Sequence, residues 1–153
     1  MNAKVVPDER KRVAAIAETC VNNRLRQVTR VVSGFYDGLL SAAGLHGNQL
    51  ILLVVPYLAG SIPINRMADL TGLDRTTLVR NLKSIEDQGW VTIKPGADRR
   101  MRLVTLTDKG RETLIAALPL WEQAQEQVLE LLGSQHAALM DILNTLGTLE
   151  QDR

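Results

Sequence analysis

The residues from Glu9 to Ala43 form the longest uninterrupted helical pattern in the chain. Apolar residues recur there at every third or fourth position, the spacing that places side chains along one face of an α-helix. They are Val13, Ile16, Ala17, Cys20, Val21, Leu25, Val28, Val31, Val32, Phe35, Leu39 and Leu40. Such a helix is over roughly 50 Å long, and a chain of 153 residues cannot easily cover both of its flanks. We therefore expect a second copy of the chain to cover the apolar stripe.

The C-terminal end has a similar need for a partner. The sequence predicts helices over about 108–132 and 135–149, separated by Gly133 and Ser134. The last helix carries an apolar stripe with no later element to cover it: Leu139, Ile142, Leu143, Leu146 and Leu149. A self-complementary twofold interface would cover both ends. We expect residues 1–45 and 110–153 to form a helical dimerisation region.

Between these two regions, the periodicity changes several times. Helices are expected over about 47–58, 64–70 and 75–88, with Asp74 as the N-cap of the third and Gly89 at its end. Residues 90–94 and 101–106 read as two strands joined by a turn. A helix, a turn, a capped helix and a β-hairpin in this order form a winged helix-turn-helix, here predicted over 46–109. The expected fold is mainly α with a small β-hairpin wing and flanking N- and C-terminal dimerisation helices.

Charge is distributed unevenly along the chain. The whole chain has a net charge of +1, but residues 60–111 carry +4 and residues 112–153 carry −6. The basic middle can therefore present an anion-binding surface that the total charge hides.

In a winged helix-turn-helix, the second helix of the motif, here expected over 75–88, enters the major groove of DNA with its N-terminal residues leading. Arg80 and Asn81 can bind guanine and adenine edges, and Thr76 and Thr77 suit phosphate oxygens or thymine methyl groups.

The turn of the hairpin is rich in arginine, at Arg99, Arg100 and Arg102. Guanidinium groups on a protruding turn can enter a narrow minor groove, where the negative potential is concentrated. Asp98 alone would repel phosphate, so we expect it to brace a neighbouring arginine. The expected DNA-binding residues are Arg75, Thr76, Thr77, Arg80, Asn81, Lys83, Asp98, Arg99 and Arg100.

Three segments resemble the MarR family of bacterial transcription regulators: LDRTTLVRNL at 73–82, DRR at 98–100 and LVTLTDKG at 103–110. The Asp-x-Arg pattern, followed by a strand that ends in Leu-Thr-x-x-Gly, is the most specific part of the resemblance. The resemblance implies an obligate homodimer that binds a palindromic operator in double-stranded DNA, most often as a repressor. It also implies that Arg100 is the minor-groove arginine and Asp98 its bracing carboxylate.

The first helix also suggests a signal input. Arg24 is the one charged residue on its apolar face, and a cation there needs a partner. That partner is either a carboxylate of the chain or a small organic anion. The resemblance implies an effector, an aromatic carboxylate or a phenolic compound, bound between the dimerisation helices and the winged region. Cys20, Arg24 and Tyr36 are candidate pocket residues, and Trp90 is another possible wall, although both aromatic side chains also fit a plain core.

Cys20 leaves two alternatives open. It is the only cysteine, and it can act as a small buried hydrophobe or as a redox-sensing thiol, because the cation of Arg24 one turn away would favour the reactive thiolate. A further alternative is a winged helix that binds a protein instead of DNA. Such a version would more often expose apolar residues on the recognition face.

The sequence lacks the motifs of enzymes and of metal-binding proteins. The sequence has no Ser/His/Asp arrangement, paired carboxylates or glycine-rich phosphate loop, so we expect neither an enzyme nor a cofactor. His46 and His136 have no ligand-spaced neighbours, so no metal site is expected. A single cysteine excludes an intramolecular disulfide and fits a cytoplasmic protein. The longest apolar run, Leu50–Ala59, is too short to cross a membrane, and the start of the chain lacks the apolar stretch of a signal peptide.

Overall fold

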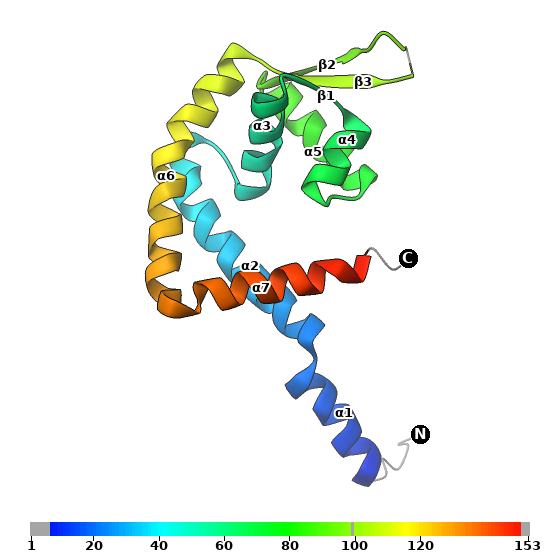
Figure 1. The fold of residues 1–153 in the computed structure, drawn as a ribbon, viewed down its shortest axis with the longest axis vertical. Helices are drawn as coiled ribbons and strands as arrows, with labels where there is room; N and C mark the ends of the chain where they lie inside the picture. Colours follow the sequence, from blue (N-terminus) through cyan, green and yellow to red (C-terminus); the bar gives the residue numbers. More distant parts are fainter. Residues whose placement is uncertain (1–6, 99, 151–153) are drawn as a thin grey trace, which may run out of the picture.

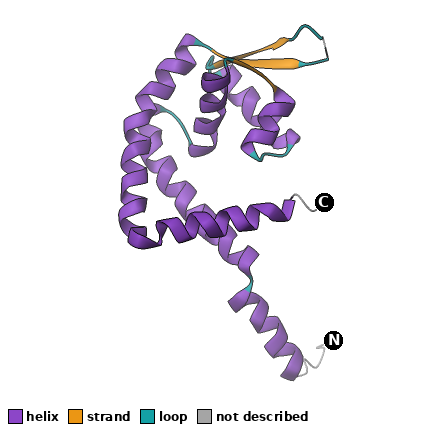
Figure 2. Cartoon of the chain, viewed as in Figure 1, coloured by secondary structure: helices purple, strands orange, loops and turns teal. Residues whose placement is uncertain are grey.

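The computed structural model describes residues 7–98 and 100–150, which are mostly helical with a small antiparallel sheet (Figure 1 and Figure 2). The helices are α1 (Pro7–Thr19), α2 (Val21–Leu40), α3 (Gly47–Ala59), α4 (Ile64–Thr71), α5 (Arg75–Asp87), α6 (Asp108–Leu132) and α7 (His136–Gly147). The strands are β1 (Ser61–Pro63), β2 (Val91–Pro95) and β3 (Arg102–Leu106). Short 3₁₀ helices follow α2, α6 and α7, at Ser41–Ala43, Gly133–Gln135 and Thr148–Glu150. The predicted fold class, mainly α with a β-hairpin wing, is confirmed.

The winged lobe consists of α3, α4, α5 and the sheet, which lie together at the top of Figure 1. The strand order is β1-β3-β2, and both pairs are antiparallel, with Val104 of β3 between Ile62 and Ile93. Each element sends apolar side chains into one core: Leu52, Leu53, Ile62, Met67, Leu78, Leu82, Ile85, Val91 and Val104. This shared core fixes α5 and the hairpin relative to one another.

The strand β1 is not predicted by the sequence pattern. Its three residues are too few to show the alternation that marks a strand, and its partner β3 lies about forty residues later in the chain. Only the folded chain brings the two together, with Ser61 opposite Thr105. The hydroxyl of Thr105 donates a hydrogen bond to Ser61 Oγ at 3.0 Å across this pair.

Two glycines make the sharp turns around α5 possible. Gly72, between α4 and α5, has φ +64°, and Gly89, between α5 and β2, has φ +75°. Left-handed backbone of this kind is strained for residues with a Cβ. The amide of Gly72 donates to the carbonyl of Ala68 at 3.0 Å, which closes the end of α4. The helix-turn-helix can therefore turn within three residues, between Thr71 and Arg75.

The helices α2 and α6 lie side by side and carry the winged lobe (Figure 1). The hydroxyl of Tyr36 on α2 donates to Gln125 Oε1 on α6 at 2.7 Å. Asp37 Oδ1 accepts a hydrogen bond from the amide of Gly47 at 2.6 Å, which ties α2 to the start of α3. Leu40 and Leu114 are buried in the same core cluster as the winged lobe. The lobe and the two helices therefore form one continuous core.

The prediction of one unbroken helix from Glu9 to Ala43 is wrong at Cys20. There the backbone has φ −66° and ψ 108°, which ends α1 and makes Cys20 the residue before α2. The hydroxyl of Thr19 donates back to the carbonyl of Ala15 at 2.7 Å, a contact that often bends helices. Thr19, Cys20 and Val21 also have low helix propensity. The apolar spacing continues across the break, which is why periodicity alone does not reveal it.

Large apolar side chains on the outer helices are exposed in the single chain. Val13 and Ile16 on α1 are 64% and 65% exposed, and Val31 on α2 is 70% exposed. Ile142 and Leu143 on α7 are exposed as well. Figure 1 shows α1 projecting away from the rest of the molecule. Much of the apolar stripe expected from the sequence is therefore left uncovered by the described part of the chain.

Candidate nucleic-acid interface

The helix α5 is fixed at its start by Asp74. The Asp74 side chain accepts a hydrogen bond from the amide of Thr77 at 2.9 Å, as predicted for an N-cap. Hydrogen bonds from the side chain and the amide of Thr77 hold the pKa of Asp74 below its ordinary value. Leu78 and Leu82 are buried on the opposite side of the helix. The cap and the core together set which face of α5 is turned to solvent.

That outward face carries the predicted recognition residues. Arg75, Thr76 and Arg80 are exposed, and Thr77 and Asn81 are half-buried at its edge. Their side chains come from about two turns of helix, and all five can donate hydrogen bonds. This is the residue set that a helix entering a major groove presents to base edges.

Lys83 is on the same helix, but it is paired within the chain. Its Nζ lies 2.6 Å from Asp87 Oδ1, one turn away. The hydrogen bond to Asp87 raises the pKa of Lys83 above its ordinary value. Both side chains are well exposed, so the pair is weak and can exchange for a phosphate. A DNA contact by Lys83 stays a prediction.

The turn of the wing is organised by Asp98. Its Oδ1 accepts a hydrogen bond from the backbone amide of Arg100 at 2.9 Å, and its carbonyl accepts one from the amide of Met101 at 2.9 Å. An aspartate that binds the amide two residues later stabilises a tight turn. Asp98 therefore braces the backbone that carries Arg100, and Arg100 is exposed. Arg99, the third predicted wing residue, lies outside the described residues.

A cleft between α4, α5 and the wing gathers four arginines. We call it the arginine cleft; its charged residues are Arg66, Asp69, Arg75, Arg100 and Arg102. Its volume is about 280 Å³. Arg66 is absent from the sequence-based predictions because an arginine on an exposed helix face is ordinary by itself. Only the fold brings it next to Arg75 and the wing.

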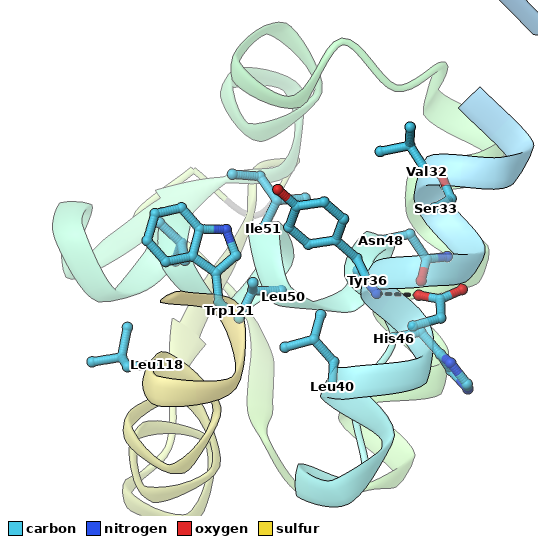
Figure 3. Close-up of a pocket in the computed structure, with 13 residues that line it drawn as sticks. Val32, Ser33, Tyr36, Leu40, His46, Asn48, Leu50, Ile51, Leu118 and Trp121 are labelled. Atoms are coloured by element: carbon cyan, nitrogen blue, oxygen red, sulfur yellow. Dashed lines mark hydrogen bonds between the residues drawn. The ribbon is translucent and has the colours of Figure 1, made fainter. Parts of the chain in front are cut away.

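A second and larger cavity lies between α2, α3 and α6. It has a volume of about 1020 Å³, and Figure 3 shows the rings of Tyr36 and Trp121 on its wall. It is lined by Val32, Ser33, Tyr36, Asp37, Leu40, His46, Gly47, Asn48, Leu50, Ile51, Val54, Leu118 and Trp121. Burial raises the pKa of the Tyr36 hydroxyl. Of the residues predicted for an effector pocket, Tyr36 lines this cavity and Cys20 and Arg24 do not.

The remaining candidate residues lie elsewhere. Cys20 is half-buried at the junction of α1 and α2, and Arg24 is exposed on α2. Trp90 is 6% exposed and belongs to the core. The backbone amide of His46 donates a hydrogen bond to Gln49 Oε1 at 3.0 Å at the start of α3. Among residues 7–98 and 100–150, no group of three or more His, Cys, Asp or Glu side chains could hold a metal ion.

No single helix in the part of the chain that the structure describes is long and apolar enough to cross a membrane. The segments Asp8–Ala43 and Gly47–Ala59 reach that threshold only as a pair, with a bend of 66° between them.

Comparisons with known proteins show which family has this architecture. No family model matches the chain. The structure of the M. tuberculosis transcriptional regulator MosR in complex with DNA is 34% identical in sequence and superposes with a TM-score of 0.80. The match covers 88% of this chain and 98% of the MosR chain. A variant of MarR from E. coli, crystallised with operator DNA, superposes with a TM-score of 0.75 over 86% of this chain and 95% of that one, at 20% identity.

The chain belongs to the MarR family of transcription regulators. A curated relative agrees with this assignment: an uncharacterized HTH-type transcriptional regulator of Bacillus subtilis, YdgJ, is 28% identical over 123 residues, which are 78% of this chain and 73% of the relative. This MarR-family protein is accordingly a DNA-binding transcription regulator and not an enzyme. The alternative of a winged helix that binds protein instead of DNA is set aside.

Proposed function

We propose that this regulator binds a palindromic operator as a homodimer and represses transcription until a small phenolic compound releases it. The observation that carries this proposal is the single exposed face formed by α5 and the wing. It combines Arg75, Arg80 and Asn81 with the braced turn at Asp98 and Arg100. That face has the donors needed for base edges and the arginine needed for a narrow minor groove.

The homodimer is supported by the apolar surface of the outer helices. Val13, Ile16 and Val31 together with Ile142 and Leu143 are exposed on α1, α2 and α7. Patches of this extent on a monomer mark an interface. The ends of the chain also have opposite charge, because residues 1–59 carry +3 and residues 112–153 carry −6. A second copy can therefore pair acidic helices with basic ones while it covers the apolar stripe.

The mass of the protein in solution tests the homodimer. Sedimentation velocity should give twice the 16.9 kDa of one chain at micromolar concentration. A double charge substitution on the stripe, Val13→Glu with Ile16→Glu, should shift the mass toward one chain. The matched control is Ala15→Glu on the same helix, which adds a negative charge at an exposed position outside the stripe and should leave the mass unchanged. A monomeric wild-type protein would contradict the proposal.

Selection of bound fragments from genomic DNA tests the operator. We call α5 and the wing of one chain its reading head. A homodimer with one reading head per chain should select an inverted repeat with half-sites about one helical turn apart, ~34 Å. Arg80→Ala should relax the preference at one base pair of each half-site, and Arg100→Ala should weaken binding mainly where the minor groove is narrow. If both variants bind the selected sequence like the wild type, the site assignment is wrong.

The effector proposal is supported by the cavity between α2, α3 and α6. Its volume of about 1020 Å³ suits a small organic molecule, and its walls are mostly apolar, with Tyr36 and Trp121 among them. The described lining contains one carboxylate, Asp37, and no lysine or arginine. A neutral phenol therefore fits it better than the organic anion that Arg24 suggested. The cavity also joins the outer helices to the winged lobe, so a ligand there can change the spacing of the two reading heads.

Release of DNA by a panel of phenols and aromatic acids tests the effector. The expected result is that neutral phenols dissociate the wild-type protein from its operator and that Trp121→Ala raises the concentration required. Asp37 is unsuitable as a test residue because it holds the start of α3. Release by aromatic acids alone, with no effect of Trp121→Ala, would refute the assignment.

We also place the protein in the cytoplasm, where the chromosome lies.

A further inference from the structure

The arginine cleft has more positive charge than its own chain neutralises. Four guanidinium groups from three elements face one carboxylate, that of Asp69. The only ion pair of that carboxylate in the described chain is with Arg66, at 3.9 Å, and the two side chains are 64% and 69% exposed. An exposed pair at this distance is worth little. The cleft is therefore a cationic site with room for an acceptor.

The guanidinium groups are also free to donate. Within residues 7–98 and 100–150, Arg75 and Arg100 have no side-chain hydrogen bond, and Arg102 makes one, to the carbonyl of Ile93 at 3.3 Å. Each guanidinium has five N–H donors in a planar fork. That geometry matches two oxygens of a phosphate group. A phosphodiester, with two unesterified oxygens and one negative charge, has the chemistry that this cleft would bind.

The position of the cleft indicates where such a group comes from. It lies between α5, which in the proposed function enters the major groove, and the wing, which enters the minor groove. The sugar-phosphate strand is what separates these two grooves. A duplex bound in this way must therefore pass one strand along the cleft.

We propose that the arginine cleft holds a backbone phosphate of the DNA strand that runs between the two grooves, with Arg66 of α4 as a dedicated phosphate contact. This inference rests on the proposed placement of α5 and the wing. A phosphate contact fixes the register of the protein on the duplex and carries no sequence information. Arg66 therefore contributes affinity for any sequence, in contrast to Arg80 on the recognition face.

Binding to two labelled duplexes over a KCl series tests this role. One duplex of 30 base pairs has a sequence that the wild-type protein selects from genomic DNA, and the other is a shuffled version of it. Fluorescence anisotropy should show that Arg66→Gln weakens binding to both duplexes by the same factor. The slope of log K against log salt should become shallower by about 0.9 for each phosphate that the protein no longer neutralises, or about 1.8 for two chains.

Two variants serve as controls for this measurement. Arg66→Lys keeps the charge, so it should restore most of the salt slope. Arg10→Gln removes an exposed arginine from α1, far from the winged lobe in Figure 1, and should leave the slope unchanged. Thermal unfolding followed by circular dichroism should give the wild-type midpoint for all three variants, because both arginines are exposed.

Single methylphosphonate substitutions locate the phosphate. Each phosphate of the selected duplex is replaced in turn by this neutral analogue. One substitution per half-site should weaken binding by the wild-type protein and leave Arg66→Gln unaffected, because that variant has no arginine to bind this phosphate. If no position shows this behaviour, the cleft does not hold a DNA phosphate.

Three other outcomes also decide between explanations. A weakening confined to the selected duplex would assign Arg66 to base recognition and overturn the proposal. Equal salt slopes, together with a thermal midpoint that inorganic phosphate raises only in the presence of Arg66, would assign the cleft to a free anion and also overturn it. A wild-type protein that selects no sequence would contradict the proposed operator, while the slopes on the shuffled duplex would still test the cleft.

Discussion

Replacing Gly110 with alanine should destabilise this fold more than the addition of one methyl group suggests. Gly110 lies in the first turn of α6 and is buried. A Cβ at this position would overlap the backbone carbonyl of Trp90 and lie 2.8 Å from Leu106 Cδ1. The leucine side chain can rotate, but the carbonyl belongs to the backbone between α5 and β2. The methyl group can therefore be accommodated only if α6 moves away from the winged lobe.

The hydrogen bonds of that carbonyl set the size of the effect. Trp90 O accepts a hydrogen bond from the amide of Thr107 at 3.0 Å and shares the Thr107 hydroxyl proton with Gly89 O, the two oxygens lying 3.0 and 2.7 Å from that hydroxyl. Overpacking costs about 1–3 kcal/mol, and each weakened hydrogen bond adds about 1 kcal/mol. Alanine in place of glycine within a helix returns about 1 kcal/mol. The free energy of unfolding should therefore fall by about 3 kcal/mol, and Tm by roughly 6–12 °C for a chain of this length.

Urea unfolding followed by far-ultraviolet circular dichroism measures this change. The protein concentration is kept constant, because the stability of the proposed dimer would depend on it. Gly38→Ala on α2 is the matched control, since a Cβ there meets nothing within 4 Å in the chain. It should leave stability unchanged or raise it by up to about 1 kcal/mol. A Gly110→Ala protein as stable as the wild type would refute the reasoning.

Four further predictions concern single side chains. Asp98→Ala should lower DNA affinity several-fold in anisotropy titrations at an unchanged Tm, because the amide of Arg100 loses its acceptor; a Tm that falls in parallel would instead indicate a structural role. Tyr36→Phe should lower the free energy of unfolding in urea by about 1 kcal/mol through loss of the bond to Gln125, and an unchanged midpoint would show that this bond adds nothing. The pKa of Asp74 is lowered in the folded state, so its stabilising effect is present above the unfolded value, ~3.9, and is lost as the pH falls through the folded pKa. Asp74→Ala should accordingly flatten the acid limb of a plot of urea midpoint against pH, and an identical limb in both proteins would contradict this. Cys20→Ser should abolish any weakening of DNA binding by peroxide if the thiol is a sensor; the same peroxide response in both proteins would remove Cys20 from that role.

Local sequence signals predicted the hairpin strands, the cap of α5 and the bounds of α6 well. The helix α6 was expected over 108–132 and is observed as Asp108–Leu132. Asp74 caps α5 as predicted. The strand expected over 90–94 is observed as Val91–Pro95, and the strand expected over 101–106 is observed as Arg102–Leu106. These features depend on neighbours within four residues, such as a cap and the amide it accepts. Interactions of that range can be predicted from the order of the residues alone.

Other features depend on residues that meet only in the folded chain. The break at Cys20 lies within an unbroken apolar pattern, and β1 requires β3 as its partner. The apolar face of the first helix pointed to Arg24 as the charged residue of an effector pocket, yet the cavity is lined by Tyr36 and Asp37 further along α2. A helix presents several faces, and the position of α3 and α6 decides which part of α2 encloses space.

The sequence alone therefore determined the order of the elements, the exposed face of α5 and the apolar stripe of the first helix, since each follows from a repeating pattern of apolar and polar residues. The first helix illustrates both sides: its apolar stripe follows from the sequence, but its division into α1 and α2 came only from the structure. The tertiary structure also decided which charges share a site. Arg66 and Arg102 are far apart in the chain and meet in the arginine cleft because the core of the winged lobe packs α4 against the hairpin. Packing of that kind depends on the shapes of distant side chains, which no local pattern encodes.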